Sequence, residues 1–120
     1  MPNKKPDGEA AFNKLFYTYK NNAKVRGIAF HLSKKEFLRL TKLSCTYCGV
    51  EPQQEAYQYW KDGKSTVPYV YNGVDRVDNE RGYYKNNVAT CCGVCNNAKR
   101  SLAVEQFTAW LLRIANFVKP

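Results

Sequence analysis

The stretch of sequence that decides the fold runs from Cys45-Thr-Tyr-Cys48 to Cys92-Gly-Val-Cys95. Each pair has two residues between its cysteines, a spacing that lets both thiolates reach one metal ion, and 43 residues separate the two pairs. Four thiolates complete a tetrahedral zinc site and leave no coordination position open, so we expect a structural zinc ion that fastens the ends of this segment together. Cys91 could pair with Cys95 at a wider spacing. The tighter spacing favours Cys92 as the ligand and leaves Cys91 as a small strand residue.

The charge of the chain predicts a polyanionic partner. Its 120 residues include 19 basic and 10 acidic side chains, which give a formal net charge of +9 at pH 7. Such a balance is typical of proteins that bind nucleic acid, so we expect DNA, with RNA as the alternative. The length fits one small domain whose core a bound metal helps to stabilise. We expect a flexible basic arm over residues 1–7 and a single domain over 8–120, with its zinc-stapled core at about 45–100.

The cysteine content and the N-terminal sequence favour a reducing compartment. Five cysteines could also form disulfides, but the first residues lack the apolar stretch of a secretory signal, and one cysteine would be left unpaired. No run of the sequence reaches the roughly 18 apolar residues of a membrane span. We therefore expect a cytoplasmic protein with no membrane contact.

Hydrophobic periodicity predicts helices in the first third of the chain. Apolar residues recur at helical spacing over residues 11–23, and Ser33-Lys-Lys-Glu36 is a capping box that opens a second helix through Leu43. Residues 28–32 between these helices predict a short strand. The segment 50–68 has no clear period and favours a loop or a short hairpin.

The second half of the chain predicts a hairpin followed by two helices. Residues 67–77 are rich in β-branched and aromatic side chains, residues 78–82 have turn chemistry, and residues 86–90 can return as the second strand. A helix is expected after Cys95. A last amphipathic helix places five apolar residues on one stripe: Phe107, Trp110, Leu111, Ile114 and Val118.

Two groups of lysines are candidates for contacts with nucleic acid. Three lysines lie opposite the apolar stripe of the first predicted helix, where they form either a solvated face or a row of phosphate contacts. Two more follow the aromatic residues of segment 57–60, which can stack on exposed bases or can simply pack against the domain. The five residues are Lys14, Lys20, Lys24, Lys61 and Lys64.

The order of the motifs carries a family resemblance. A C-x2-C pair is followed by a hairpin with Asp75 on its first strand, then by Asn87-Val, and then by C-x2-C-Asn96 with Lys99 nearby. This order, over about residues 45–99, resembles the HNH endonuclease family. The run Gly-Val-Asp-Arg-Val-Asp-Asn and the segments that flank the motifs are similar to a subgroup met often in phage and mobile-element proteins.

The resemblance implies a ββα-metal fold in which a hairpin and a helix hold one divalent ion, Mg²⁺ or Mn²⁺, against a scissile phosphate. Asp75 and Asn96 would be ligands of this ion, Lys99 and Arg100 would hold the flanking DNA backbone, and Asn87 would fix the loop that carries the general base. The implied activity is hydrolysis of DNA phosphodiester bonds, by nicking or double-strand cleavage, by a monomer or weak homodimer that a virus could encode.

Simpler roles remain open for three of these residues. Asp75 could form only a salt bridge with Arg76 or a neighbouring lysine. Asn87 could be only a turn residue, and Asn96 could only cap the helix that follows the second cysteine pair.

Position 76 departs from the family pattern, because most HNH proteins have a general-base histidine there and this chain has Arg76. A guanidinium stays protonated near neutral pH and cannot accept the proton. Asp78 shares the strand face of position 76 and could act as the base, or it could start an Asx turn. Another possibility is that the metal ion alone activates the attacking water, with Arg76 as a clamp on the phosphate. His31 is the one histidine available as a base, and Tyr83 or Tyr84 could attack the phosphate directly.

Three functions therefore stay open. The first is a metal-dependent DNA endonuclease, which retention of Asp75 and Asn96 favours. The second is a zinc-stapled protein that binds nucleic acid after catalysis was weakened or lost through Arg76. The third is an assembly protein that uses segment 57–60 as its contact surface.

Overall fold

The computed structural model describes residues 8–59 and 67–118, which form an α+β fold with two small antiparallel sheets. The predicted helices and hairpin amount to an α+β domain with an amphipathic helix at each end, and this architecture confirms that fold class. The predicted basic arm 1–7, Lys61 and Lys64 lie outside the described residues. In chain order the elements are α1 (Glu9–Val25), α2 (Lys34–Thr41), β1 (Gln54–Ala56), β2 (Tyr69–Tyr71), β3 (Gly73–Arg76), a 3-10 helix η1 (Lys85–Asn87), β4 (Val88–Cys91), α3 (Gly93–Lys99) and α4 (Val104–Phe117).

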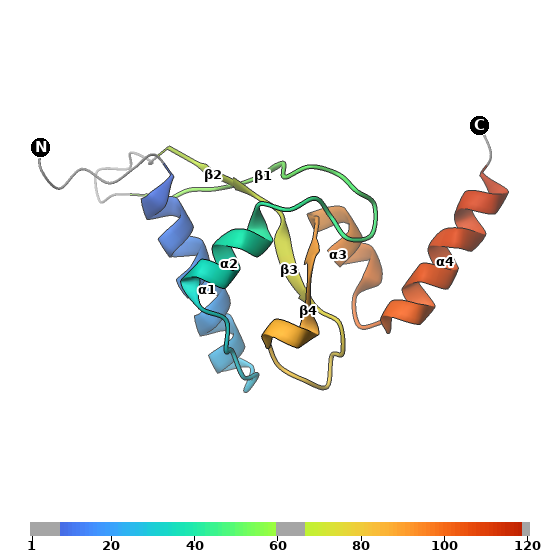
Figure 1. Ribbon diagram of the computed structural model, residues 1–120, viewed down its shortest axis with the longest axis horizontal. Helices are drawn as coiled ribbons and strands as arrows, with labels where there is room; N and C mark the ends of the chain where they lie inside the picture. The colour runs from blue at the N-terminus through green and yellow to red at the C-terminus, as the bar shows by residue number, and fades with distance from the viewer. Residues whose placement is uncertain (1–7, 60–66, 119–120) are drawn as a thin grey trace, which may run out of the picture.

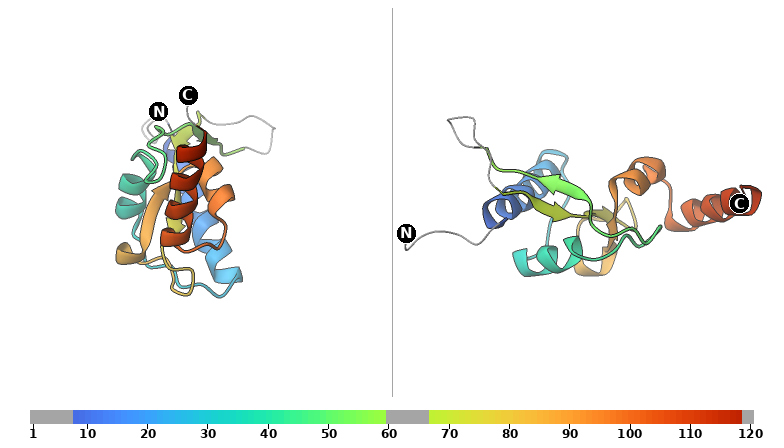
Figure 2. Two further views of the ribbon diagram at one scale, coloured as in Figure 1. Left: turned by 90° about the vertical axis from the view of Figure 1, so that its right-hand side faces the viewer. Right: turned by 90° about the horizontal axis from the view of Figure 1, so that it is seen from above.

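The β3–β4 hairpin lies at the centre of the described chain (Figure 1). Its register pairs Gly73 with Cys91 and Arg76 with Val88, so Asp75 faces Ala89 across the ladder. Helix α2 lies on one side of the hairpin, and α1 and α3 lie on the other (Figure 2). Because β4 runs directly into α3, the strand that carries Asp75 is held beside the second cysteine pair.

The main core lies between α1, α2 and the first residues of the hairpin. Phe37 is fully buried, and three rings of α1 surround it with centroid distances of 5.0–6.0 Å. Edge-on arrangements at these distances are the favoured geometry for aromatic pairs. The three rings are those of Phe12, Phe16 and Tyr19. The helical spacing that predicts α1 is therefore the spacing that fills this core.

The predicted capping box at the start of α2 is confirmed. The Ser33 hydroxyl accepts a hydrogen bond from the Glu36 amide at 3.1 Å, and the Glu36 carboxylate accepts one from the Ser33 amide at 2.9 Å. These two bonds satisfy amide groups that a helix leaves free at its first turn. They fix the residue at which α2 begins, and the position of α2 in turn sets the position of Cys45, which follows it in the chain.

The predicted strand over residues 28–32 is wrong in its extent. Only Phe30 forms a bridge, with Tyr83, through bonds from the His31 amide to the Tyr83 carbonyl and from the Tyr83 amide to the Ala29 carbonyl, both 2.8 Å. The partner segment turns away into η1, so no further ladder bonds can form.

The predicted strand over residues 67–77 is split in two at Asn72. The Asn72 amide donates to the Thr41 carbonyl at 2.9 Å, and its side chain donates to the carbonyls of Leu43 and Val50. These bonds take Asn72 out of both sheets. As a result β2 pairs with β1, and β3 pairs with β4. The hairpin predicted within residues 50–68 therefore has only its first strand there, because its second strand, β2, lies beyond residue 68.

Helix α4 is packed against the body only near its start. Phe107 is fully buried and contacts the cysteine cluster, with Trp110 and Leu111 beside it. Farther along, Ile114, Phe117 and Val118 are 38%, 88% and 65% exposed, so the last two residues of the predicted apolar stripe, Ile114 and Val118, face solvent. Figure 1 shows the helix extending away from the hairpin.

We expect Gly82→Ala to destabilise the protein by about 1–3 kcal/mol, the usual cost of overpacking. A Cβ at this position would lie 2.5 Å from the Ala29 carbonyl oxygen, where the backbone of the Phe30–Tyr83 bridge cannot retreat. Urea unfolding measures the change. Gly93→Ala is the matched control, because its Cβ would meet only the flexible end of Gln54 at 3.1 Å. Equal stability of the two variants would contradict this packing.

Candidate functional site

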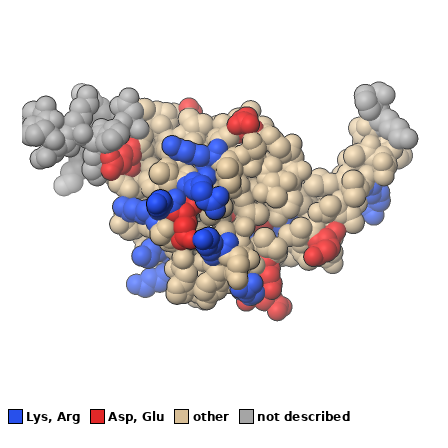
Figure 3. All heavy atoms as spheres, in the orientation of Figure 1, with Lys and Arg blue, Asp and Glu red and all other residues tan. Residues whose placement is uncertain are grey.

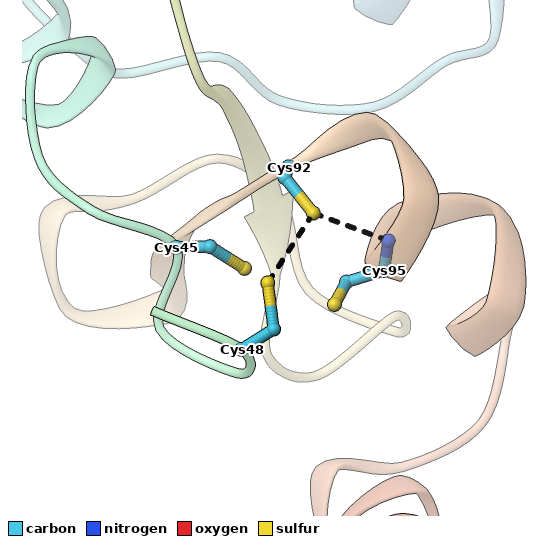
Figure 4. Close-up of side chains that lie close together, drawn as sticks. All are labelled: Cys45, Cys48, Cys92 and Cys95. Atoms are coloured by element: carbon cyan, nitrogen blue, oxygen red, sulfur yellow. Dashed lines mark hydrogen bonds between the residues drawn. The ribbon is translucent and has the colours of Figure 1, made fainter. Parts of the chain in front are cut away.

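Four cysteine sulfur atoms meet at one point of the structure, all within 4.8 Å of one another (Figure 4). The sulfur atoms of Cys48 and Cys92 are 3.7 Å apart. A tetrahedral zinc ion with Zn–S bonds of about 2.3 Å separates its ligands by about 3.8 Å, so the cluster fits zinc. The predicted ligand set of Cys45, Cys48, Cys92 and Cys95 is therefore confirmed as a metal-binding arrangement.

Two tight turns aim these sulfur atoms at the same point. Cys92 is the N-cap of α3, and its sulfur accepts a hydrogen bond from the Cys95 amide at 3.4 Å. The first pair lies on a turn that the Gly49 amide closes by donating to the Cys45 carbonyl at 2.9 Å. Burial raises the pKa of the Cys45 thiol, but backbone amides that donate to its sulfur outweigh burial and lower the pKa to about 6. These amides stabilise the thiolate form of Cys45, the form that binds a metal ion. By contrast, burial raises the pKa of the Cys95 thiol.

Cys91 lies outside the cluster, as its place on the strand predicts. It is the last residue of β4, it is fully buried, and its thiol donates to the Cys92 carbonyl at 3.4 Å. Burial raises the pKa of this thiol to about 12, with the Asp75 charge adding to the effect.

A polar cleft of about 810 Å³ lies between α1, β3 and α3. It brings together four of the predicted site residues, Asp75, Arg76, Asn96 and Arg100, which are far apart in the sequence. Other polar residues of the lining come mainly from α1 and the end of α3: Thr18, Asn22, Arg26, Asn97 and Ser101.

Asp75 is buried at the floor of this cleft and already has a cationic partner. Its Oδ2 atom is 3.0 Å from Lys99 Nζ, and the Tyr47 hydroxyl donates to the same oxygen at 3.5 Å. Burial and the charge of Asp75 raise the pKa of Tyr47 well above its usual range. The sequence analysis missed Tyr47, although its position between two zinc ligands was a signal that the zinc site would fix it in place.

Lys99 is placed differently from its predicted role. The resemblance implies a contact with the DNA backbone, but the Lys99 side chain is fully buried and has no surface that could meet a phosphate. Instead it forms the salt bridge to Asp75 that was the simpler alternative for that carboxylate. This is the one ion pair within residues 8–59 and 67–118.

Arg76 lines the cleft but is also tied to the turn that follows β3. Its Nη1 atom donates to the carbonyls of Asn79 at 2.7 Å and Arg81 at 3.0 Å. The guanidinium carbon lies 5.7 Å from the centre of the Tyr83 ring, a cation–π distance. Arg76 therefore closes the turn with one edge of its guanidinium.

Asn87 is buried at the end of η1 and fixes the same turn from there. Its side-chain nitrogen donates to the carbonyls of Asp78 and Gly82, and its oxygen accepts from the Asp78 amide at 2.9 Å. Asp78 uses its carboxylate to accept from the Glu80 amide at 2.9 Å, which is an Asx turn. Asp78 is not among the residues that line the cleft.

The remaining catalytic candidates also divide into residues that line the cleft and residues that do not. Asn96 is exposed within α3 and lines the cleft, and Cys92 rather than Asn96 is the cap of that helix. His31 is exposed and stacks on Tyr84 with ring centres 4.9 Å apart and planes at 9°, away from the cleft lining. Tyr83 does line the cleft.

Basic side chains occupy two sides of the described chain. Lys14, Lys20 and Lys24 are exposed on α1, but none of them lines the cleft. A second group was missed by the sequence analysis, although its spacing of four and three residues was a signal. This group surrounds a shallow groove on α2. Helix α2 lies on the opposite side of the hairpin from α1 and α3. Figure 3 shows Lys and Arg side chains gathered on this side. We name Lys35, Arg39, Lys42 and Lys85 the α2 basic face.

Comparison with known proteins gives one relative by sequence. No protein-family model matches the chain. An uncharacterized protein of Acanthamoeba polyphaga mimivirus is 36% identical over 104 residues, which are 87% of this chain. The chain spans 17% of the length of that viral protein.

Comparison with solved structures concerns the fold. The rare-cutting HNH restriction endonuclease PacI superposes with a TM-score of 0.60, covering 88% of this chain and 77% of PacI, at 21% sequence identity. The fold is similar to that of an HNH endonuclease. No helix among the described residues is long and apolar enough to cross a membrane.

We expect Cys95→Ser to lose bound zinc and its cooperative thermal unfolding transition, because a three-thiolate site no longer closes the fold. Cys91→Ser is the matched control, since Cys91 is equally buried yet lies outside the cluster. It should retain one zinc ion per chain. Zinc content by atomic absorption and unfolding by circular dichroism measure both effects. Loss of zinc in Cys91→Ser would contradict the ligand assignment.

Proposed function

We propose that the chain is a metal-dependent DNA endonuclease of the HNH type, which hydrolyses phosphodiester bonds. The observation that carries this proposal is the cleft in which a carboxylate and an amide, Asp75 and Asn96, lie with the cations Arg76 and Arg100. The fold similarity to an HNH endonuclease supports the proposal, and so does the net charge of +9.

The donor atoms in the cleft fit a hard divalent cation. Asp75 and Asn96 offer oxygen ligands, and Mg²⁺ takes one or two carboxylates while substrate phosphates and water complete its shell. Mn²⁺ accepts the same ligands. When bound, such an ion would stabilise negative charge on the phosphate and lower the pKa of the attacking water.

The protein's own residues would place the DNA against this site. Arg26 and Arg100 are exposed at the cleft and can neutralise phosphates on either side of the scissile bond. Arg76 has a second role available, because both of its hydrogen bonds within the described chain come from Nη1 and leave Nη2 and Nε for a phosphate oxygen. Asn87 would keep Arg76 in position by holding the turn.

Neither of the two side chains suggested as general base from the sequence, Asp78 and His31, lines the cleft, which favours a reaction in which neither acts as the base. Asp78 is engaged in its Asx turn outside the cleft lining, and His31 stacks on Tyr84. Arg76 would then act as a phosphate clamp, at some loss of rate compared with a histidine at this position.

A second candidate function is a zinc-stapled protein that binds nucleic acid without cleaving it. The observation that favours it is Arg76 itself, whose guanidinium cannot accept a proton. The mimivirus relative supports an origin in a virus or mobile element for either function.

We expect the protein to nick supercoiled plasmid in Mg²⁺ or Mn²⁺, and Asp75→Ala to lose at least about a hundredfold in rate, the usual cost of removing a group that stabilises the transition state. Gel electrophoresis of the plasmid measures the rate. A wild type that is inert while Arg76→His gains activity would favour the second function. Catalysis would be abandoned if all three proteins bind DNA and none nicks it.

We also expect Arg100→Gln to weaken DNA binding and to lower the slope of log K against log salt by about 0.9, the change for one lost phosphate contact. Arg113→Gln is the matched control, because Arg113 is an equally exposed arginine on α4, outside the cleft lining. Fluorescence anisotropy over a range of salt concentrations measures the slope. Equal slopes for both variants would remove Arg100 from the interface.

A further inference from the structure

The structure contains a buried cation at the point where the proposed function places a metal ion. Lys99 is fully buried, and its one charged partner within the described part of the chain is Asp75. The Lys99 Nζ atom makes no well-directed hydrogen bond to any described residue, so its attraction to Asp75 is chiefly that of one charge for another.

Burial makes this pairing obligatory for both side chains. An ammonium group without water is retained in a protein only beside an opposite charge. Asp75 is also buried, and its Oδ2 atom has both Lys99 and the Tyr47 hydroxyl as neighbours. The negative charge of Asp75 is therefore already balanced before anything enters the cleft.

Lys99 is the last residue of α3, and its side chain is held inside the fold. Arg100 follows it with φ 49°, the one non-glycine residue of the described chain in the left-handed region. This turn at the end of α3 points two adjacent basic side chains in different directions: Lys99 is buried beside Asp75, and Arg100 is exposed at the cleft. Only Gly and, less often, Asn or Asp adopt such a conformation readily.

We propose that Lys99 is the resident counter-ion of Asp75 and limits how tightly the protein without DNA holds a divalent cation; this rests on the proposed function, which places that cation at Asp75 and Asn96. A divalent cation in the cleft meets a carboxylate whose charge is compensated, and the buried ammonium repels it. A DNA phosphate supplies the missing negative charge. Divalent cation and DNA therefore bind with positive coupling, each raising the affinity for the other.

The experiment compares Lys99→Gln with Lys99→Arg. Glutamine keeps a hydrogen-bond donor for Asp75 and removes the charge, whereas arginine keeps the charge. Mn²⁺ affinity of the zinc-loaded protein without DNA is measured by titration calorimetry. We expect Lys99→Gln to bind Mn²⁺ about tenfold tighter than the wild type, Lys99→Arg to resemble the wild type, and Asp75→Asn to abolish the gain in the Lys99→Gln background. Unchanged or weaker Mn²⁺ binding by a folded Lys99→Gln variant would overturn the proposal.

A measurement on the wild type covers the case in which Lys99→Gln does not fold, which zinc content and near-ultraviolet circular dichroism would reveal. Mn²⁺ affinity is compared with and without a short phosphorothioate duplex, and we expect about tenfold tighter binding with the duplex. Equal affinities would overturn the proposal. Plasmid nicking separates the two failures: a wild type that nicks without this coupling loses only the role of Lys99, whereas one that neither binds Mn²⁺ nor nicks loses the proposed function.

Discussion

The rest of the structure depends on the meeting of four thiolates from two turns. The cluster joins the end of α2 to the start of α3, and so closes the segment that contains both small sheets. In a chain of this size the hydrophobic cores alone give little stability, and a metal that holds the ends of a long loop reduces the entropy of the unfolded chain. Phe107 packs on the same cluster, so the attachment of α4 also depends on it.

The cysteine cluster and the cleft are linked through one residue. Tyr47 lies between two cysteine ligands, and its hydroxyl reaches Asp75 at 3.5 Å. Its ring packs edge-on against Phe107 with centres 5.2 Å apart. The position of the Cys45–Cys48 turn therefore influences the position of the Asp75 carboxylate in the cleft through a direct contact. A misplaced Tyr47 would remove one of the two groups that orient Asp75.

Local signals in the sequence predicted the parts of the fold that depend on local chemistry. The C-x2-C spacing gave the cluster, the Ser33–Glu36 pair gave the start of α2, and helical periodicity gave α1. The parts that depend on tertiary context were missed. The split at Asn72 follows from bonds to residues 22–31 positions earlier in the chain, which no local pattern contains.

The candidate site also divides into features that the sequence predicted and features that depend on tertiary context. Among the predicted site residues, Asp75, Arg76, Asn96 and Arg100 line one cleft, whereas Asp78, Asn87 and Lys99 are not in its lining. The burial of Lys99 could not be predicted, because its neighbour Arg100 is an equally basic residue, and which of the two faces inward depends on how α3 packs and on the turn that ends it.

Helix α4 has the geometry of a lever. Its anchor is Phe107, and Phe117 lies ten residues farther on, which at 1.5 Å per residue is a distance of about 15 Å along the axis. A rotation of the anchor, such as one caused by a change in the cysteine cluster, therefore produces its largest movement at the far end of the helix. A label near Phe117 would thus report on the state of a metal site that it does not touch.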